Sequence, residues 1–363
     1  RADEKGDPHA LQNLAGAAQS YRSRELVSEK VIGPLADAFS PSTLAVLADE
    51  FNKQVYGDKG TERTGRQTLL FGKPELDELA RQARDLAGKI QPLVTPFGDV
   101  PEGAKEQKKH TAECAKAAKD VIDAWKSSFK ANLKTMRDQT SGHAGIAAAL
   151  FGRMVTSDTS ANIDAPIHVA HAFTTHASEE ESDYLTAVDD LKRDDSDAGA
   201  DTIQEAELTS GIYYGYVVVD VPGLVANTAG CDRGDWQDVD RALAADVVHN
   251  LHYLIAEISP GAKLGSTAPY GRAELMLVEM GNRQPRSLSP AFRDPSRPQI
   301  VDAIERLGAH VETIDQLYET GETRRVLSVA NAPFPSAPNA TLRELATWAG
   351  DSVRAGAIAG ASG

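Results

Sequence analysis

Three histidines fall within the segment PIHVAHAFTTH, which runs from Pro166 to His176. Imidazole ligates zinc and transfers protons near neutral pH, so no other segment of the chain is as suggestive of chemistry. On a strand, His168 and His176 share one face while His171 points to the other, and on a helix the three spread over roughly 140°. Neither period brings three imidazoles to one ion.

The residues around these histidines do not complete a metal site. Zinc sites usually add a Cys, Asp or Glu ligand, and the acidic residues of this region begin only at Glu179. An HxxH pair on a helix would still supply two ligands, so a metal-binding enzyme built on His168, His171 and His176 stays open as one alternative. The pattern favours the simpler interpretation that these histidines form hydrogen bonds within a sheet.

The common catalytic motifs are absent from the sequence. It has no GxxxxGK[ST] phosphate loop, no GxGxxG after a predicted strand, no HExxH and no GxSxG turn. No pair of carboxylates sits in the kind of apolar setting that shifts a pKa. Cys114 and Cys231 lie far apart without CxxC partners, which supports neither a zinc knuckle nor a disulfide framework. The absence of these motifs lowers the odds of catalysis without excluding it, and the sequence otherwise leads us to expect no cofactor and no bound metal.

The composition is typical of a folded protein of the cytoplasm. The chain has 363 residues and a hydrophobic content of 41%, enough for one large domain or several smaller ones. No run approaches ~20 apolar residues and no leader pattern is present, so neither a membrane span nor a secretion signal is expected. The net charge of −15 alone argues against nucleic-acid binding, although charges segregated along a chain weaken that argument.

The first half of the chain has the apolar spacing of helices. This spacing predicts helices over residues 25–39, 40–51, 73–90 and 104–136. We find no convincing strand pair before Met136. At the end of the last helix, basic residues recur at steps of four, four and three, namely Lys126, Lys130, Lys134 and Arg137. Such a row is typical of a solvated helix face, and the alternative is a stripe that follows a phosphate backbone.

After residue 150 the pattern becomes that of strands. We expect strands over 167–175, 211–221 and 273–281 and helices over 241–258, 298–309 and 341–355. This order indicates an α+β fold with a small antiparallel sheet. The connection 179–201 holds ten acidic residues against two basic ones, yet its DYLTAVDDL stretch is half apolar. It predicts a projecting β-hairpin arm, with a disordered acidic loop as the alternative.

The central block of the sequence resembles the CasC family, the repeated backbone subunits of the type I-E CRISPR surveillance complex, Cascade. The matching pieces are GRM (152–154), VAHAFTTH (169–176) and TAVDDL (186–191), in the same order and at the same spacing. Weaker likeness covers roughly residues 20–350, through segments such as PGAK and ELMLVEM.

The resemblance implies a hand-like α+β fold with an RRM-like (ferredoxin-like) antiparallel palm, an inserted set of helical fingers and an extended β-hairpin thumb. Residues 1–150 would form the fingers, 151–177 a palm strand and its approach, 178–210 the thumb, and 211–363 the rest of the palm with the C-terminal helices. The family opens with a palm strand and a basic segment that nothing before Tyr21 resembles. We therefore expect this chain to lack the N-terminal palm strand.

The resemblance also carries over a set of RNA-binding residues. Met154 matches a position that packs against a guide base, although without the resemblance it would be an ordinary core methionine. The thumb-tip residues that would wedge against the kinked duplex are Tyr184, Leu185, Thr186 and Val188. Such wedges replace lost base stacking and need no sequence code. Arg153 and Lys263 are the candidate phosphate partners.

The resemblance implies a non-catalytic CRISPR RNA-binding backbone subunit of type I-E Cascade, acting in antiviral defence. Together with other Cascade subunits it would self-associate in a helical filament along the guide, kink the RNA and present it for pairing with target DNA. The alternative is a metal-dependent, ribonuclease-type subunit that cleaves at each kink through Asp183, Asp189 and Asp190. In either case the histidine segment becomes a palm strand that leads to the thumb.

Overall fold

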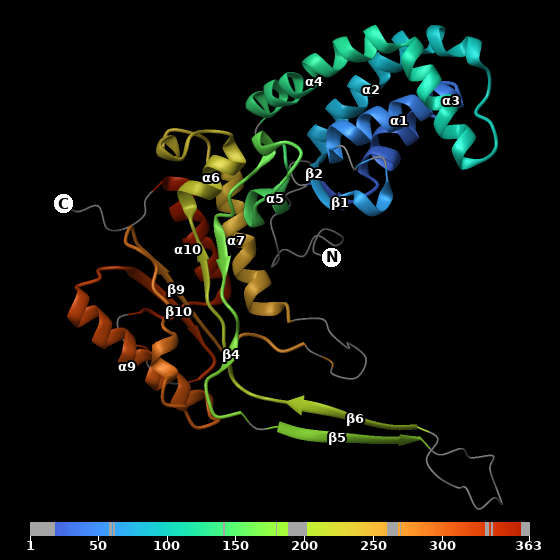
Figure 1. The fold of residues 1–363 in the computed structure, drawn as a ribbon. Coiled ribbons are helices and arrows are strands. Elements are labelled where there is room, and N and C mark those ends of the chain that lie inside the picture. The colour runs from blue at the N-terminus through green and yellow to red at the C-terminus, as the bar shows by residue number, and fades with distance from the viewer. Residues whose placement is uncertain are drawn as a thin grey trace, which may run out of the picture. The chain divides into compact units, whose positions relative to one another are not determined.

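A computed structural model describes residues 19–57, 60, 62–140, 142–178, 180–187, 202–259, 268, 270–330, 334 and 337–356. The described residues form two compact units: the first lies within 19–168, 218–250 and 350–356, and the second lies within 169–217 and 251–349. Helices combine with small antiparallel sheets (Figure 1), which confirms the α+β prediction. The predicted absence of an N-terminal palm strand concerns residues that lie outside the described part.

Four helices form the body of the first unit, namely α1 (Pro41–Tyr56), α2 (Lys73–Val94), α3 (Ala104–Ala117) and α4 (Lys119–Gln139). Ser40 caps α1 by accepting a hydrogen bond from the Thr43 amide, as the sequence predicts. The single helix predicted over 104–136 is wrong, because the chain turns at Ala118 between α3 and α4. No Gly or Pro marks this turn in the sequence.

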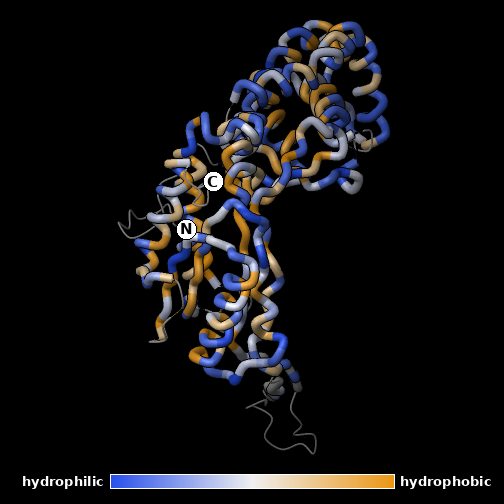
Figure 2. The backbone as a smooth tube through the Cα atoms, turned by 90° about the vertical axis from the view of Figure 1, so that its left-hand side faces the viewer, coloured by the Kyte–Doolittle hydropathy of each residue, from blue (hydrophilic) through white to orange (hydrophobic). Residues whose placement is uncertain are grey.

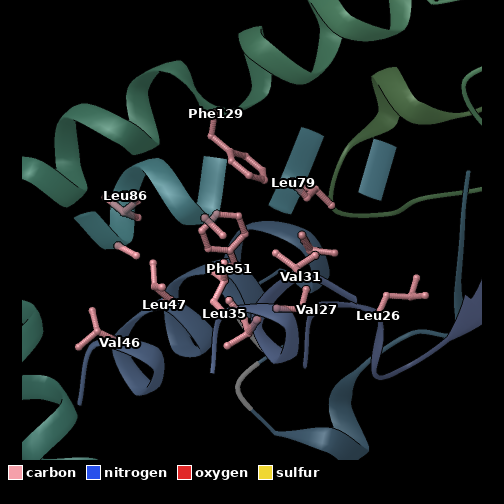
Figure 3. Close-up of a cluster of buried hydrophobic side chains, with 14 of the residues drawn as sticks. Leu26, Val27, Val31, Leu35, Val46, Leu47, Phe51, Leu79, Leu86 and Phe129 are labelled. Atoms are coloured by element: carbon pink, nitrogen blue, oxygen red, sulfur yellow. The ribbon is translucent and has the colours of Figure 1, made fainter. Parts of the chain in front are cut away.

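The core of the first unit lies between these helices. Phe51 of α1 packs against Trp125 and Phe129 of α4, with ring centroids 4.6 and 5.9 Å apart, respectively. Figure 3 shows Phe51 and Phe129 among the buried aliphatic residues of the cluster, including Leu79 of α2. This core is what the apolar spacing of the sequence predicts for helices that share one buried side.

A strand pair that the sequence did not predict stands beside these helices. β1 (Ser20–Ser23) pairs antiparallel with β2 (Leu69–Gly72), so our expectation of no strand pair before Met136 is wrong. All four residues of β2 are buried, which removes the polar–apolar alternation that reveals a half-exposed strand. The helix predicted over 25–39 is also shorter than expected: it consists of a π-helical segment, Val27–Ile32, followed by one tight turn, Gly33–Leu35.

Shorter elements complete the first unit. They are α5 (Ile146–Phe151), α6 (Val221–Ala229), and parts of α7 (Ala242–Glu257) and α10 (Leu342–Ala355), which also contribute residues to the second unit. The helices predicted over 241–258 and 341–355 are thereby confirmed.

The second unit contains a two-stranded sheet covered by a helix. β9 (Leu275–Met280) pairs antiparallel with β10 (Thr323–Ser328), and Ile304, Leu307 and Val311 of α9 (Ile300–Tyr318) share a core with Val326 of β10. β9 was predicted, whereas β10 was not, because its TRRVLS sequence carries two arginines. Its Arg324 is nonetheless buried, where it pairs with Asp315 and with Glu279.

The histidine segment and the GIYYGYVVVDV segment pair with each other through short strands. β4 (Phe173–Thr174) pairs with β7 (Tyr213–Tyr214), and β3 (Ile167–Val169) pairs with β8 (Val217–Val219). Between β4 and β7, the chain forms the hairpin of β5 (Glu180–Ala187) and β6 (Thr202–Thr209). Each predicted long strand is therefore two shorter strands.

The distribution of hydropathy along the chain is that of a protein with buried cores. Figure 2 shows hydrophobic and hydrophilic residues alternating along the helices. Within the part of the chain that the structure describes, no helix has the length and apolar character needed to cross a membrane.

Candidate nucleic-acid interface

The hairpin of β5 and β6 presents Tyr184, the aromatic residue of the predicted thumb tip. The register places Tyr184 opposite Glu205 and Ser182 opposite Glu207. Because directly opposed residues of an antiparallel pair share a face, these four side chains lie on one side of the hairpin. Tyr184 is 61% exposed. An exposed phenol of this kind is available for stacking on a base.

The other predicted residues of this hairpin are only partly within the described structure. Leu185 and Thr186 belong to β5, as does Asp183, one of the acids of the cleavage alternative. Four predicted residues lie outside the described part of the chain, namely Val188, Asp189, Asp190 and Lys263.

Met154 is exposed in the first unit. Its side chain is 67% exposed, while Arg153 and Val155 on either side of it are buried. A bridge between Arg153 and Ile163 holds this extended segment, and Gly152 precedes it with φ +71°. A side chain at Gly152 would place its Cβ 2.7 Å from the Ile163 carbonyl oxygen, so the turn requires glycine. Met154 is therefore not a core methionine.

Arg153 points the opposite way, into a buried ion network. Its guanidinium binds both carboxylate oxygens of Glu75, at 2.5 and 3.0 Å, and the backbone carbonyls of Leu70 and Ala161. Arg137 of α4 joins the same Glu75 at 2.9 Å and also binds Asp158. Arg153 is a predicted phosphate partner, but in the structure its guanidinium is buried in these contacts, which hold the Met154 segment in place.

Glu75 is the centre of this network because the chain folds tightly around it. It lies in the first turn of α2 and accepts a hydrogen bond from the Gly72 amide at 3.2 Å. Gly72 is in close contact with the carbonyl of His143, whose ring nitrogen Nδ1 lies 3.5 Å from Glu75. Burial raises the pKa of Glu75, but His143 and the charges of Arg153 and Arg137 lower it by more, to about 2. The carboxylate therefore stays ionised.

The basic row on α4 is not one solvated face. Arg137 is buried on Glu75, and Lys126 forms an ion pair of 2.6 Å with Glu50. Lys130 donates to the carbonyl of Ser157, while Lys134 is exposed. Only part of the predicted row is free to meet a phosphate, because the rotation along the helix carries Arg137 into the core.

The histidines fall into two groups. His176 is buried: its Nε2 accepts the Ile212 amide at 3.2 Å, which leaves Nδ1 to donate to the Ala177 carbonyl at 2.7 Å. This residue is the hydrogen-bonded sheet histidine that the sequence favoured. His168 and His171 are exposed. No group of three potential metal ligands occurs among the described residues.

Two exposed aromatic residues were not predicted from the sequence as candidate contact residues. Tyr213 and Phe173 lie on β7 and β4, which the hairpin connects, and both have exposed side chains. Tyr214, which lies opposite Phe173 in this pair, packs against Phe173 and Phe292 and accepts the Leu288 amide through its hydroxyl. The adjacent tyrosines of GIYYGY could have predicted one exposed ring, since neighbouring residues on a strand point to opposite faces.

Comparisons with known proteins give a family and a fold. A family model described as CT1975-like protein matches residues 2–348. A chain of a solved structure described as "CRISPR RNA-guided surveillance complex, pre-nicking" aligns with a TM-score of 0.65 and 21% identity, covering 93% of this chain and 84% of that chain. Another, described as "CRISPR RNA-guided surveillance complex", has a TM-score of 0.48 and 24% identity, covering 57% of this chain and 77% of that chain. No curated protein matches.

Proposed function

This chain belongs to the CT1975-like protein family, and from that premise we propose that it is an RNA-binding backbone subunit of a CRISPR surveillance complex of the Cascade type. The observation that carries the proposal is the fold it shares, over 93% of its length, with a chain of a CRISPR RNA-guided surveillance complex. The exposed Met154 and Tyr184 support it, because exposed apolar and aromatic side chains are what unstacked bases pack against.

The finer form of the proposal is a CasC-type subunit of a type I-E complex. The hairpin of β5 and β6 acts as a thumb on an RRM-like palm, and the helices of the first unit act as fingers. Copies associate in a helical filament along the CRISPR RNA with the other subunits of the complex. Tyr184, Leu185, Thr186 and Val188 kink the guide, Met154 packs against a base, and the remaining bases pair with target DNA.

We further propose that the subunit does not cut nucleic acid. Stacking and backbone contacts suffice to hold and shape a guide strand, and neither requires bond chemistry. The rival function is metal-dependent cleavage through Asp183, Asp189 or Asp190. Incubation of the assembled protein with labelled RNA or DNA and about 10 mM Mg²⁺ or Mn²⁺ separates the two functions. Cuts at regular spacing that disappear on Asp→Ala substitution would replace our proposal with the rival one.

Guide binding is tested by removing the two proposed base contacts together. The double variant Met154→Ala/Tyr184→Ala is expected to assemble poorly on CRISPR RNA while keeping the thermal stability of the unmodified protein. A matched control is Leu317→Ala/Tyr318→Ala at the end of α9, whose side chains are 73% and 66% exposed. Equal assembly of both variants on RNA would refute the assignment of these two residues.

A further inference from the structure

A second polar surface lies directly beside Met154 in the first unit. Gln67 donates from Nε2 to the Met154 carbonyl oxygen at 3.3 Å, and its Oε1 accepts the Thr156 hydroxyl at 3.1 Å. The neighbouring Thr68 accepts from Nε of Arg24 at 3.3 Å. The adjacent residues Gln67 and Thr68 thus contact the Met154 segment and Arg24, respectively, and Arg24 directly follows β1.

The arginines of this surface face solvent. Arg22 in β1 and Arg24, which directly follows β1, are both exposed. Met154 and Thr156 are exposed with the same alternation, while Arg153 and Val155 point inward. β1, β2 and α5 lie side by side in Figure 1, which keeps these segments together.

The local charge is positive, although the chain as a whole carries −15. The segments 20–25 and 62–69 hold four arginines and two glutamates. One of these acids, Glu25, is bound by both Arg63 and Arg66. Among the residues that the structure describes, Arg22 has no ion-pair partner, and neither terminal nitrogen of Arg24 has one. These guanidinium groups are therefore free to form the paired hydrogen bonds that phosphate accepts.

We infer that Arg22, Arg24, Gln67 and Thr156 bind the sugar–phosphate backbone of the single-stranded RNA whose base packs on Met154. The inference rests on the proposed function and extends it from a base contact to a backbone contact. Arg22 and Arg24 neutralise successive phosphates, and the amide and hydroxyl groups of Gln67 and Thr156 contact the sugar edge. The carbonyl of Met154, held by Gln67, fixes the position of the base contact relative to the phosphates.

The salt dependence of binding is the measurement that separates charge contacts from other contacts. The full chain is titrated against a fluorescein-labelled oligouridine at several salt concentrations. For Arg22→Ala/Arg24→Ala we expect about tenfold weaker binding at about 0.1 M salt and a salt slope shallower by about 1.4, the value for two phosphates on a single strand. Gln67→Ala should weaken binding without changing the slope, because it removes no charge.

The control removes the same charge elsewhere on the first unit. Arg84→Ala/Lys89→Ala changes two exposed side chains of α2. Its salt slope should differ from that of the unmodified chain by less than half as much as the slope of Arg22→Ala/Arg24→Ala does. If the unmodified chain fails to bind oligouridine, the proposed function itself fails. If the unmodified chain binds and the Arg22/Arg24 variant has the same affinity and slope as the control, this inference is overturned while the proposed function stands. Thermal unfolding of each variant verifies that it is folded.

Discussion

Met154 lies beside a buried ion network, whereas Tyr184 lies on a hairpin whose described pairing involves one other strand. The segment of Met154 is fixed by Arg153, which binds Glu75 and two backbone carbonyls. Among the described residues, the strand of Tyr184 pairs with β6 in a two-stranded sheet. A two-stranded ribbon by itself is marginally stable, so its residues are less precisely placed than those next to a buried network.

The charges of the two regions also differ. The surface that Gln67 and Thr68 join to the Met154 segment carries the exposed Arg22 and Arg24, whereas Tyr184 shares its face with Glu205 and Glu207. Phosphates are attracted to the first surface and repelled by the second. The comparison suggests a division of labour, in which the first unit grips the RNA backbone in a fixed register and the hairpin inserts apolar and aromatic groups between bases.

The largest expected effect comes from breaking the network behind Met154. Arg153→Ala leaves the buried Glu75 with less compensation, and loss of one partner of a buried pair costs about 3–5 kcal/mol of unfolding free energy. Urea unfolding, with hydrogen exchange of peptides from α2 and α4, measures it. Arg84→Ala and Tyr184→Ala change exposed side chains and serve as controls, with expected changes within about 0.5 kcal/mol. An Arg153→Ala protein as stable as these controls would show that the network does not hold the segment.

The second effect is a pH dependence of stability that arises in the first unit. The pKa of Glu75 falls from its ordinary 4.5 to about 2 on folding. Since the unfolded chain takes up the proton more readily, this contribution to stability is present above about pH 4.5 and is lost as the pH falls towards about 2. It amounts to about 3 kcal/mol.

Glu75→Gln tests this dependence. The variant should be less stable at neutral pH, and its stability should fall less steeply with acid than that of the unmodified protein. Burial raises the pKa of Asp158, but Ser160 and Arg137 lower it by more, so Asp158 keeps part of the dependence in the variant. Equal slopes of unfolding free energy against pH for both proteins would contradict the assignment of Glu75.

The third effect separates stacking from charge on the hairpin. Tyr184→Ala should weaken RNA binding by about 1–3 kcal/mol, the contribution of one aromatic platform, and should leave the salt slope unchanged. Tyr184→Phe keeps the ring and should bind almost normally. Tyr318→Ala, which removes an equally exposed tyrosine of α9, is the control for fluorescence titrations with labelled RNA. A change of slope in Tyr184→Ala would mean that the hairpin contributes charge contacts, against the comparison.

The smallest effect comes from the acidic face of the hairpin. Glu205→Gln/Glu207→Gln should tighten RNA binding about two- to threefold at low salt, because it removes repulsion of the phosphates, and the gain should vanish above about 0.5 M salt. Glu305→Gln/Glu312→Gln on α9 changes the same charge at exposed positions of another element. If RNA binding tightens by the same factor in both variants, the effect comes from the net charge of the chain and not from the position of Glu205 and Glu207 on the hairpin.

The sequence predicted the elements that have a clear apolar period. α2 is the best case: Leu76, Leu79, Ala83 and Leu86 were expected inside, and all four are buried. β2 was missed because a strand buried at every position has no alternation, and the break at Ala118 was missed because alanine and lysine favour helix on both sides of it.

The candidate site was predicted less completely than the fold. The resemblance selected the GRM motif, but a motif does not tell which of its side chains points outward. The bridge from Arg153 to Ile163 decides this, and it depends on a contact between residues that local sequence patterns do not reveal. Likewise, the surface of Arg22, Arg24 and Gln67 is assembled from β1, the residue that follows it and the residues before β2, and these two segments lie more than forty residues apart in the sequence.

The central claim is that copies of this chain shape a guide RNA without cutting it. Chemical probing of the RNA backbone in the assembled complex, with and without Mg²⁺, tests this claim directly. We predict hyper-reactive nucleotides at regular intervals, where bases are displaced, with the strand intact and the pattern lost in Tyr184→Ala. A uniform reactivity along bound RNA, or Mg²⁺-dependent cleavage at those intervals, would contradict it.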